Sequence, residues 1–375
     1  MILSETQVAI RDAVREFAQE EIRPLSSHFE QQGGYDDGLF ERIAALGLLG
    51  MVAPEEYGGA ASDYVSYALA LIEIAAADGA LSTIVSIQNS IMVSGLLRDG
   101  TAEQKALFLP ELISGRCIGA FALTETDAGS DASAIRTRAT KVDGGWRLDG
   151  AKQFITSGKI AGLAMVIAVT DASAGKKGMS AFLVPTDRPG YIVDKVEHKL
   201  GQVASDTCAL RFENLFVEDE LVLGQVGQGY RIALSNLETG RLGIAAQCVG
   251  MAQAALDIAT QYAKERVSMG KPIIDHQAVG FRLADLATRL EAARQLVLSA
   301  AALRDEGLPA LAQASMAKLF ASETAEIVVS GAIQTLGGYG YLEEFGVAKI
   351  YRDVRVCQIY EGTSDIQRMV IARSL

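Results

Sequence analysis

One glutamate near the end of the chain has neighbours that suit acid–base chemistry. The chain reads I-Y-E-G-T-S-D-I-Q-R there, so Glu361 lies between Tyr360 and Gly362. An aromatic neighbour can desolvate a carboxylate, and a glycine lets the backbone aim it into a cleft. Burial of this kind raises the pKa of a carboxyl group towards the range of a general base. The alternative is a solvated loop glutamate just before a last helix, which Ser364 and Gln367 would open as a capping box.

Two further segments have residue types that bind polar ligands. Residues 121–131 read F-A-L-T-E-T-D-A-G-S-D, and their hydroxyls and backbone amides suit a polar heterocycle or a phosphate. Residues 334–341 read Q-T-L-G-G-Y-G-Y, and their glycines allow the backbone to approach a ligand closely. The alternatives are an ordinary capped loop for the first segment and a glycine helix stop for the second.

Two arginines lie in apolar, helical sequence and therefore need anionic partners. A guanidinium in the neighbourhood of Arg241 or Arg266 is expected to pair either with a carboxylate, as a structural salt bridge, or with the phosphate of a ligand. His276 lies close to a helix start and is interpreted as a capping or surface residue.

Several other kinds of site are excluded by missing motifs. No G-x-G-x-x-G follows a strand, no G-x-x-x-x-G-K-[ST] occurs, and no G-x-S-x-G is present, which argues against Rossmann, P-loop and serine-nucleophile sites. The four cysteines are far apart and there are only three histidines, so no metal site is expected.

Composition indicates a soluble globular protein without nucleic-acid or membrane partners. The net charge of −12 repels nucleic acid, and no run of 18 apolar residues predicts a membrane span. The scattered cysteines are typical of reduced thiols, and the N-terminus does not resemble a signal or transit peptide. We therefore expect a cytoplasmic location in a bacterium, or the mitochondrial matrix if the chain has been processed.

The first third of the chain is expected to be an N-terminal helical domain, residues 1–118. Capping-box pairs, Ser4 with Gln7 and Thr101 with Gln104, mark two helix starts. Between them, long apolar helical stretches are predicted from 64 to 77 and from 81 to 97.

A β domain is expected over residues 119–224. The turn Asp143-Gly144-Gly145 predicts a hairpin. The predicted strands are short, rich in β-formers and separated by Gly, Pro and Asp, and they cover residues 136–142, 146–148, 163–170, 179–185, 191–196 and 207–212. This spacing indicates a small antiparallel barrel or sandwich.

A C-terminal helical bundle is expected over residues 225–375. One long helix shows an apolar face formed by Leu283, Leu286, Leu290, Ala293, Val297 and Ala300. A second apolar face is predicted from Met316, Leu319, Phe320, Ile327 and Val328. The fold class is therefore α+β, with helices, then strands, then a helical bundle.

The order and spacing of six motifs resemble the acyl-CoA dehydrogenase family. They read F-A-L-T-E-T-D-A-G-S-D at 121–131, F-I-T-S-G at 154–158, L-E-T-G-R at 237–241, E-R-V-S-M-G-K-P at 265–272, Q-T-L-G-G-Y-G-Y at 334–341 and Y-R-D-x-R…I-Y-E-G-T-S-D-I-Q-R at 351–368. They cover essentially the whole chain, and six ordered motifs are far more specific than any one of them.

The resemblance implies the family's three-domain fold, ending in a four-helix bundle, with FAD bound between the β domain and the bundle. The residues it assigns to FAD are Phe121, Leu123, Thr124, Thr126, Gly129, Ser130, Phe154, Ile155, Thr156, Arg266, Gln277, Gln334, Leu336, Gly337, Gly338, Thr363, Ser364 and Asp365. Of these, Arg266, Gln277 and the 334–338 loop would reach FAD across a subunit interface of a homotetramer, a dimer of dimers.

The resemblance also assigns the catalytic base to Glu361. Some branched-chain relatives place their base at the position that is Gly240 here, and a glycine cannot serve, which favours Glu361. The residues that match substrate contacts are Ser130, Glu238, Gly240, Arg241 and Gly362. Phe154 replaces a tryptophan and Glu238 an aspartate of many members, so the flavin contact of the first and the CoA contact of the second can differ.

The implied reaction is α,β-dehydrogenation of an acyl-CoA to the trans-2-enoyl-CoA. Hydrogen bonds to the thioester oxygen, one of them from the backbone amide of Glu361, would stabilise the developing enolate. FAD would take the hydride at N5 and an electron-transfer flavoprotein would reoxidise it. Residues 240–247 and the Y-E-G-T-S ending look most like short-chain and short-branched-chain members. The alternatives are an acyl-CoA oxidase, a flavin monooxygenase, or a non-enzymatic relative that binds CoA or nucleic acid.

Overall fold

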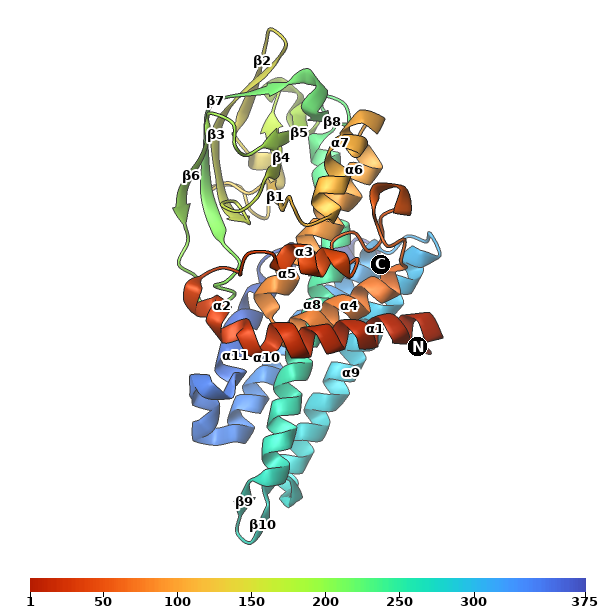
Figure 1. Cartoon of the computed structure of the whole chain (residues 1–375), viewed down its shortest axis with the longest axis vertical. Helices are drawn as coiled ribbons and strands as arrows, with labels where there is room; N and C mark the ends of the chain where they lie inside the picture. Colours follow the sequence, from red (N-terminus) through yellow and green to blue (C-terminus); the bar gives the residue numbers. More distant parts are fainter.

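The computed structural model describes residues 1–375, and its helices and strands segregate along the chain (Figure 1). The N-terminal helices are α1 (Glu5–Phe17), α2 (Ser26–Gln32), α3 (Leu39–Ala45), α4 (Tyr64–Ala77), α5 (Gly79–Ile87), α6 (Ser94–Asp99) and α7 (Ala102–Ile113). Both predicted capping boxes are present, at Ser4 with Gln7 and at Thr101 with Gln104. The predicted 81–97 helix is α5 and α6 joined by a π-helical turn (Gln88–Val93).

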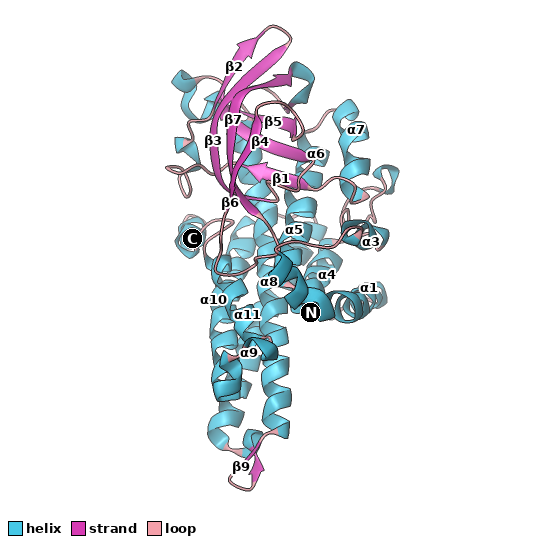
Figure 2. Ribbon diagram, turned by 60° about the vertical axis from the view of Figure 1, so that its left-hand side comes forward, coloured by secondary structure: helices cyan, strands magenta, loops and turns pink.

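The middle part of the chain forms one mixed sheet above the helices (Figure 2). Its strands are β1 (Gly119–Ala122), β2 (Arg138–Val142), β3 (Gly145–Thr156), β4 (Leu163–Val169), β5 (Met179–Pro185), β6 (Tyr191–Val196), β7 (Thr207–Glu218) and β8 (Val222–Leu223). The path runs β6-β7-β3-β2-β4-β5-β8, and the predicted hairpin joins β2 to β3.

The sheet differs from the expected antiparallel one only where strands pair with β4 in parallel. The strand β1 pairs parallel with β4 along four residues, and β2 makes one parallel pair with β4. This is possible because the long connection that contains the β2–β3 hairpin separates β1 from β4 and returns the chain in the same direction. The other pairings are antiparallel.

The C-terminal helices form an elongated bundle that carries a small hairpin at its far end (Figure 1). The elements are α8 (Gly229–Glu265), β9 (Val267–Ser268), β10 (Lys271–Pro272), α9 (Gln277–Asp305), α10 (Leu311–Leu336), α11 (Val347–Val354) and α12 (Ser364–Ala372). The three-domain α+β architecture predicted from the sequence is confirmed.

The two predicted apolar faces of the bundle had different outcomes. Every residue of the predicted face on α9 is buried. The predicted face on α10 was wrong, because only Val328 of its five residues is buried and Ile327 is exposed. The buried face of α10 consists mainly of alanines, whose small side chains allow α10 to pack closely against α8.

Two helical segments are long and apolar enough to cross a membrane by length and composition. They are Gly79–Asp99 and α8, and 83% of the apolar window of each is buried inside the fold. Their apolar character is therefore explained by the core in which they lie.

Candidate active site

The carboxyl group of Glu361 is held in an unusual way by the backbone and by burial. Its φ of 53° lies in the left-handed region, which a residue with a side chain adopts at an energetic cost, and Gly362 follows with a φ of 85°. The Oε2 atom is buried and has no hydrogen-bond partner. Burial raises the pKa of Glu361 to about 7, although Arg241 and Lys318 act in the opposite direction.

The space for this carboxylate comes from a glycine of α8. A Cβ atom on Gly240 would lie 2.5 Å from Oε2 of Glu361, so any side chain there would displace the carboxylate. A side chain at position 240 would therefore occupy the same space as the carboxylate of Glu361.

The backbone after Glu361 is fixed by side chains of two helices. The buried Nζ of Lys318 on α10 donates to the carbonyl of Gly362 at 2.8 Å. Gln367 on α12 donates through Nε2 to the carbonyls of Glu361 at 3.0 Å and Gly362 at 2.9 Å. The amide of Glu361 donates no hydrogen bond within the chain. An N–H donor is thus left beside an unpaired carboxylate.

The sequence did not reveal Lys318 or Gln367 as parts of this site. A signal for Lys318 was present, since it lies among the alanines of the buried face of α10, where a lysine needs an acceptor. The predicted start of α12 was also wrong by one residue. Thr363, not Ser364, is the N-cap, and its side chain accepts from the amide of Ile366. Gln367 is therefore free to bind the two carbonyls.

The two arginines singled out from the sequence have different environments. Arg241 is buried, donates through Nη1 to Ser315 Oγ at 3.2 Å, and leaves its Nε buried without a partner. Arg266 is exposed where α8 ends. Neither arginine makes the salt bridge that was one of the two expectations. His276 precedes α9, and its ring lies 3.1 Å from the carbonyl of Ser268.

Glu238 and Ser130 are two other substrate-site candidates. Glu238, three residues before Arg241 on α8, is 3.9 Å from Arg304, and Ser130 is exposed in the loop after β1. Burial lowers the pKa of Arg241, while Glu361 and Glu238 oppose this effect.

The 121–131 segment and the end of β3 run side by side and present unpaired polar groups. The amide of Gln153 donates to the carbonyl of Thr124 at 2.8 Å, which joins the two segments. The side chains of Thr124, Thr126 and Thr156 make no hydrogen bond within the chain. Phe154 is 64% exposed and has a φ of 59° at an irregularity in the β3–β7 pairing.

A large planar ligand with polar edges suits this surface. An exposed aromatic ring offers a stacking face, and nearby hydroxyls and amides offer hydrogen bonds. Leu123 and Ile155 are buried beneath it, and a Cβ on Gly129 would meet no atom within 4 Å. These residues fit an isoalloxazine ring with its ribityl and phosphate groups.

A buried ion pair below this surface was not predicted from the sequence. Lys152 is fully buried in β3, and its Nζ donates to Glu125 Oε1 at 2.8 Å and to the carbonyl of Leu123 at 2.9 Å. Burial lowers the pKa of Lys152 to about 8, against the effect of Glu125. Glu125 also accepts from the amides of Arg136 and Thr137. The alternation of side chains along β3 could have indicated this burial, because Lys152 lies on the same face of the strand as the buried Trp146 and Leu148.

The remaining candidates for FAD fall into two groups. Thr363, Ser364 and Asp365 open α12, close to Glu361. Arg266, Gln277, Gln334, Leu336, Gly337 and Gly338 lie at the end of the bundle opposite the β domain (Figure 1). There, Arg266, Leu336 and Gly338 line a shallow hollow of about 300 Å³. Within one chain this second group cannot share a ligand with the 121–131 segment.

Comparisons with known proteins agree with this geometry. The acyl-CoA dehydrogenase N-terminal, middle and C-terminal domain models match residues 4–116, 120–215 and 227–375. The chain therefore belongs to the acyl-CoA dehydrogenase family, a class of FAD-dependent oxidoreductases.

Several similar proteins within this family are dehydrogenases of short-chain acyl-CoA substrates. The chain is 43% identical to the mitochondrial short-chain specific acyl-CoA dehydrogenase of Bos taurus, over 100% of this chain and 90% of that protein. The structure of butyryl-CoA dehydrogenase from Megasphaera elsdenii matches with a TM-score of 0.97 and 39% identity, over 100% and 99% of the two chains. A chain in the electron transferring flavoprotein structure of Acidaminococcus fermentans matches with a TM-score of 0.98 and 40% identity, over 100% and 98%.

Proposed function

We propose that the protein dehydrogenates a short-chain acyl-CoA to the trans-2-enoyl-CoA, with Glu361 as the base that removes the α-proton. The observation that carries this proposal is the buried, unpartnered Oε2 of Glu361 and the pKa of about 7 that burial gives the group. A carboxylate with such a pKa is a much stronger base than a solvated one and is still ionised at neutral pH in a large fraction of molecules.

The residues around Glu361 have complementary roles in this proposal. Its backbone N–H, which has no partner in the chain, donates to the thioester oxygen and stabilises negative charge there. Lys318 and Gln367 hold the carbonyls of residues 361 and 362 and so keep the N–H and the carboxylate in place. FAD, when bound, supplies the acceptor for the hydride of the β-carbon.

The cofactor and substrate sites are assigned in the same proposal. The 121–131 segment, Phe154 and Thr156 contact the flavin of their own chain. The bundle end with Arg266 contacts the flavin of a second copy, which accounts for its place far from the β domain (Figure 1). Ser130, Glu238 and Arg241 contact the CoA part, and the unpaired Nε of Arg241 provides a donor there.

The substrate class and the partner follow from the relatives. Similarity to short-chain and butyryl-CoA dehydrogenases supports a short acyl chain. An electron-transfer flavoprotein is proposed as the electron acceptor, because one of the matching chains belongs to a structure named for an electron transferring flavoprotein. A homotetramer would bring the two halves of each FAD site together. The similarity to a mitochondrial protein is consistent with a cytoplasmic or matrix location.

The substitution Glu361→Gln tests the catalytic role. The variant keeps the size and the burial of the side chain but cannot accept a proton, so its rate should fall by at least about three orders of magnitude. Flavin absorbance and acyl-CoA binding should remain unchanged. The matched control is Glu343→Gln, an exposed residue that pairs with Arg352 and should keep full activity. Near-normal turnover of Glu361→Gln with butyryl-CoA would show that another group is the base.

A further inference from the structure

Four side chains form a closed ring of hydrogen bonds next to Glu361. Gln247 Nε2 donates to Thr83 Oγ1 at 2.6 Å, and Thr83 Oγ1 donates to Gln202 Oε1 at 2.7 Å. Gln202 Nε2 donates to Tyr360 Oη at 3.3 Å, and Tyr360 Oη donates to Gln247 Oε1 at 2.5 Å. Each member both donates and accepts, so the orientations of both amides are fixed by the ring itself.

The ring joins segments that are distant in the sequence. Thr83 comes from α5, Gln247 from α8, and Tyr360 from the turn before α12, whereas Gln202 comes from the connection between β6 and β7. Thr83, Gln202 and Gln247 are buried. Gln202 is therefore the contribution of the β domain to a polar cluster among helices.

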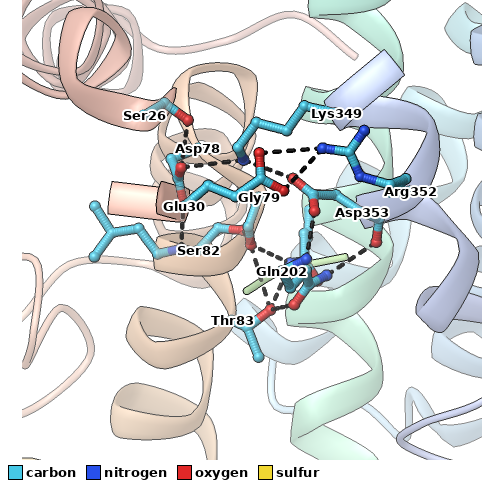
Figure 3. Close-up of polar contacts among 12 residues, drawn as sticks. Ser26, Glu30, Asp78, Gly79, Ser82, Thr83, Gln202, Lys349, Arg352 and Asp353 are labelled. Carbon is cyan, nitrogen blue, oxygen red and sulfur yellow. Dashed lines mark hydrogen bonds and ion pairs between the residues drawn. The ribbon is translucent and has the colours of Figure 1, made fainter. Parts of the chain in front are cut away.

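Gln202 is itself rigidly anchored, as Figure 3 shows. The backbone N–H of Gln202 donates to the carboxylate of Asp353, and its side-chain Nε2 donates to the backbone carbonyl of Asp353 at 3.1 Å. Asp353 pairs with Lys349 at 2.7 Å, and Lys349 lies 3.4 Å from Asp78 at the start of α5. The φ of Gln202 is 50°, so this backbone conformation is maintained by the contacts around it.

The ring completes the fixation of the strained backbone at Glu361. Lys318 and Gln367 hold the carbonyls after the Cα atom of Glu361, whereas the ring holds the side chain of Tyr360, the residue before it. A left-handed φ at a non-glycine residue carries an energetic cost that the surrounding contacts must offset. If the Tyr360 side were released, the carboxylate could turn away from its buried place beside Gly240.

We infer that Gln202 is a positioning residue for Glu361, because through Tyr360 this β-domain side chain fixes the backbone that carries the carboxylate. The inference rests on the proposed role of Glu361 as base. Gln202 does not touch the reacting atoms. It couples the placement of the β domain, which binds the flavin ring, to the placement of the base.

The test is a double-substitution cycle with Gln202→Met and Tyr360→Phe in the full-length enzyme. Methionine keeps the length of glutamine but loses every hydrogen bond of the amide group. Each single variant should lower kcat by about tenfold, equivalent to about 1.4 kcal/mol, with unchanged FAD content and KM. The apparent pKa in the kcat/KM profile should fall from about 7, because a looser carboxylate is better hydrated. The double variant should resemble the single variants, since each single substitution already removes the hydrogen bond between Gln202 and Tyr360.

Arg352→Met is the control, because Arg352 is next to Asp353 in the chain but its side chain pairs only with Glu30 and Glu343, outside the ring and its anchors. It can lower the melting temperature but should leave the pH profile unchanged. Additive effects of the two substitutions, or an unchanged pH profile in Gln202→Met, would overturn the inference while Glu361→Gln stays inactive. If Glu361→Gln keeps its activity instead, the proposed base is wrong and the inference falls with it.

Discussion

At the scale of single residues, the chemistry of Glu361 depends on a balance between burial and nearby cations. Burial raises the pKa of the carboxyl group, and Arg241 and Lys318 keep it from rising further. Neither cation forms a salt bridge with Glu361, and Lys318 is committed to a carbonyl. The carboxylate therefore keeps an unpaired oxygen that can accept a proton.

This balance predicts a pH-dependent stability difference between the protein and its Glu361→Gln variant. The pKa of Glu361 is raised from 4.5 to about 7 in the folded state, so the folded state holds this proton more tightly than the unfolded state. Stability is therefore lost as pH rises from about 4.5 to 7, by at most about 3 kcal/mol. Glutamine does not titrate and avoids this loss.

Melting temperatures of the two proteins, measured from pH 5 to pH 8 at matched FAD content, check this prediction. The variant should gain in melting temperature relative to the natural protein as pH rises, and the difference should level off above about pH 7.5. A difference that is constant with pH would mean that the carboxyl group is not buried as described.

The sequence pointed to Glu361 as the candidate base but not to the side chains that hold it. The order of the motifs pointed to Glu361, and the absence of a side chain at Gly240 supported it. The ring around Tyr360 was not foreseen, because each hydrogen-bonded pair in it is separated by more than a hundred residues and the members have no common pattern. Such contacts are set by how the domains pack, which local periodicity does not encode.

At the scale of elements, periodicity succeeded where large and small residues alternated clearly. All six residues predicted for the face of α9 are buried, whereas only one of five predicted for α10 is, because the buried face of α10 consists mainly of alanines. The β2–β3 hairpin was predicted from its turn, but the parallel pairing of β1 was not, since it depends on a distant strand.

The Lys152–Glu125 pair predicts how the 121–131 segment, which is proposed to bind the flavin, is held. Lys152→Met leaves the Glu125 carboxylate without its cation, so stability should fall by about 3–5 kcal/mol. The 121–131 segment should loosen, because Lys152 also holds the carbonyl of Leu123. The double variant Glu125→Gln/Lys152→Met has no unpaired charge and should be more stable than Lys152→Met alone.

Thermal melting and the flavin-to-protein absorbance ratio check both parts of this prediction. Lys152→Met should lose FAD on gel filtration, and the exposed control Lys141→Met, which pairs with Asp219 at the surface, should keep it. Full FAD retention in Lys152→Met would show that the ion pair is not needed for flavin binding. Equal stability of single and double variants would contradict the role of the unpaired charge.

At the scale of the whole molecule, the residues proposed to bind FAD fall into two separated groups on one chain. The β domain, which carries Phe154, lies at one end of the molecule, and the end of the bundle next to β9, where Arg266 lies, is at the other (Figures 1 and 2). The bundle end also exposes Val267, Met269 and Phe281, and Met269 is 92% exposed. Clustered exposed apolar side chains are typical of protein interfaces. Assembly of copies would bury this end and bring its arginine to a neighbour's flavin.

Charged substitutions at the bundle end should therefore affect assembly and flavin binding together. Met269→Glu/Phe281→Glu should shift the proposed tetramer to smaller species, because two carboxylates would have to be desolvated at the interface. FAD content should fall although the β-domain surface is intact. Light scattering after gel filtration and flavin absorbance measure both effects, with Leu107→Glu, an apolar position on α7 that is 61% exposed, as the control. If the bundle-end variant stays a tetramer with full FAD, the cofactor site lies within a single chain and the second copy contributes nothing to it.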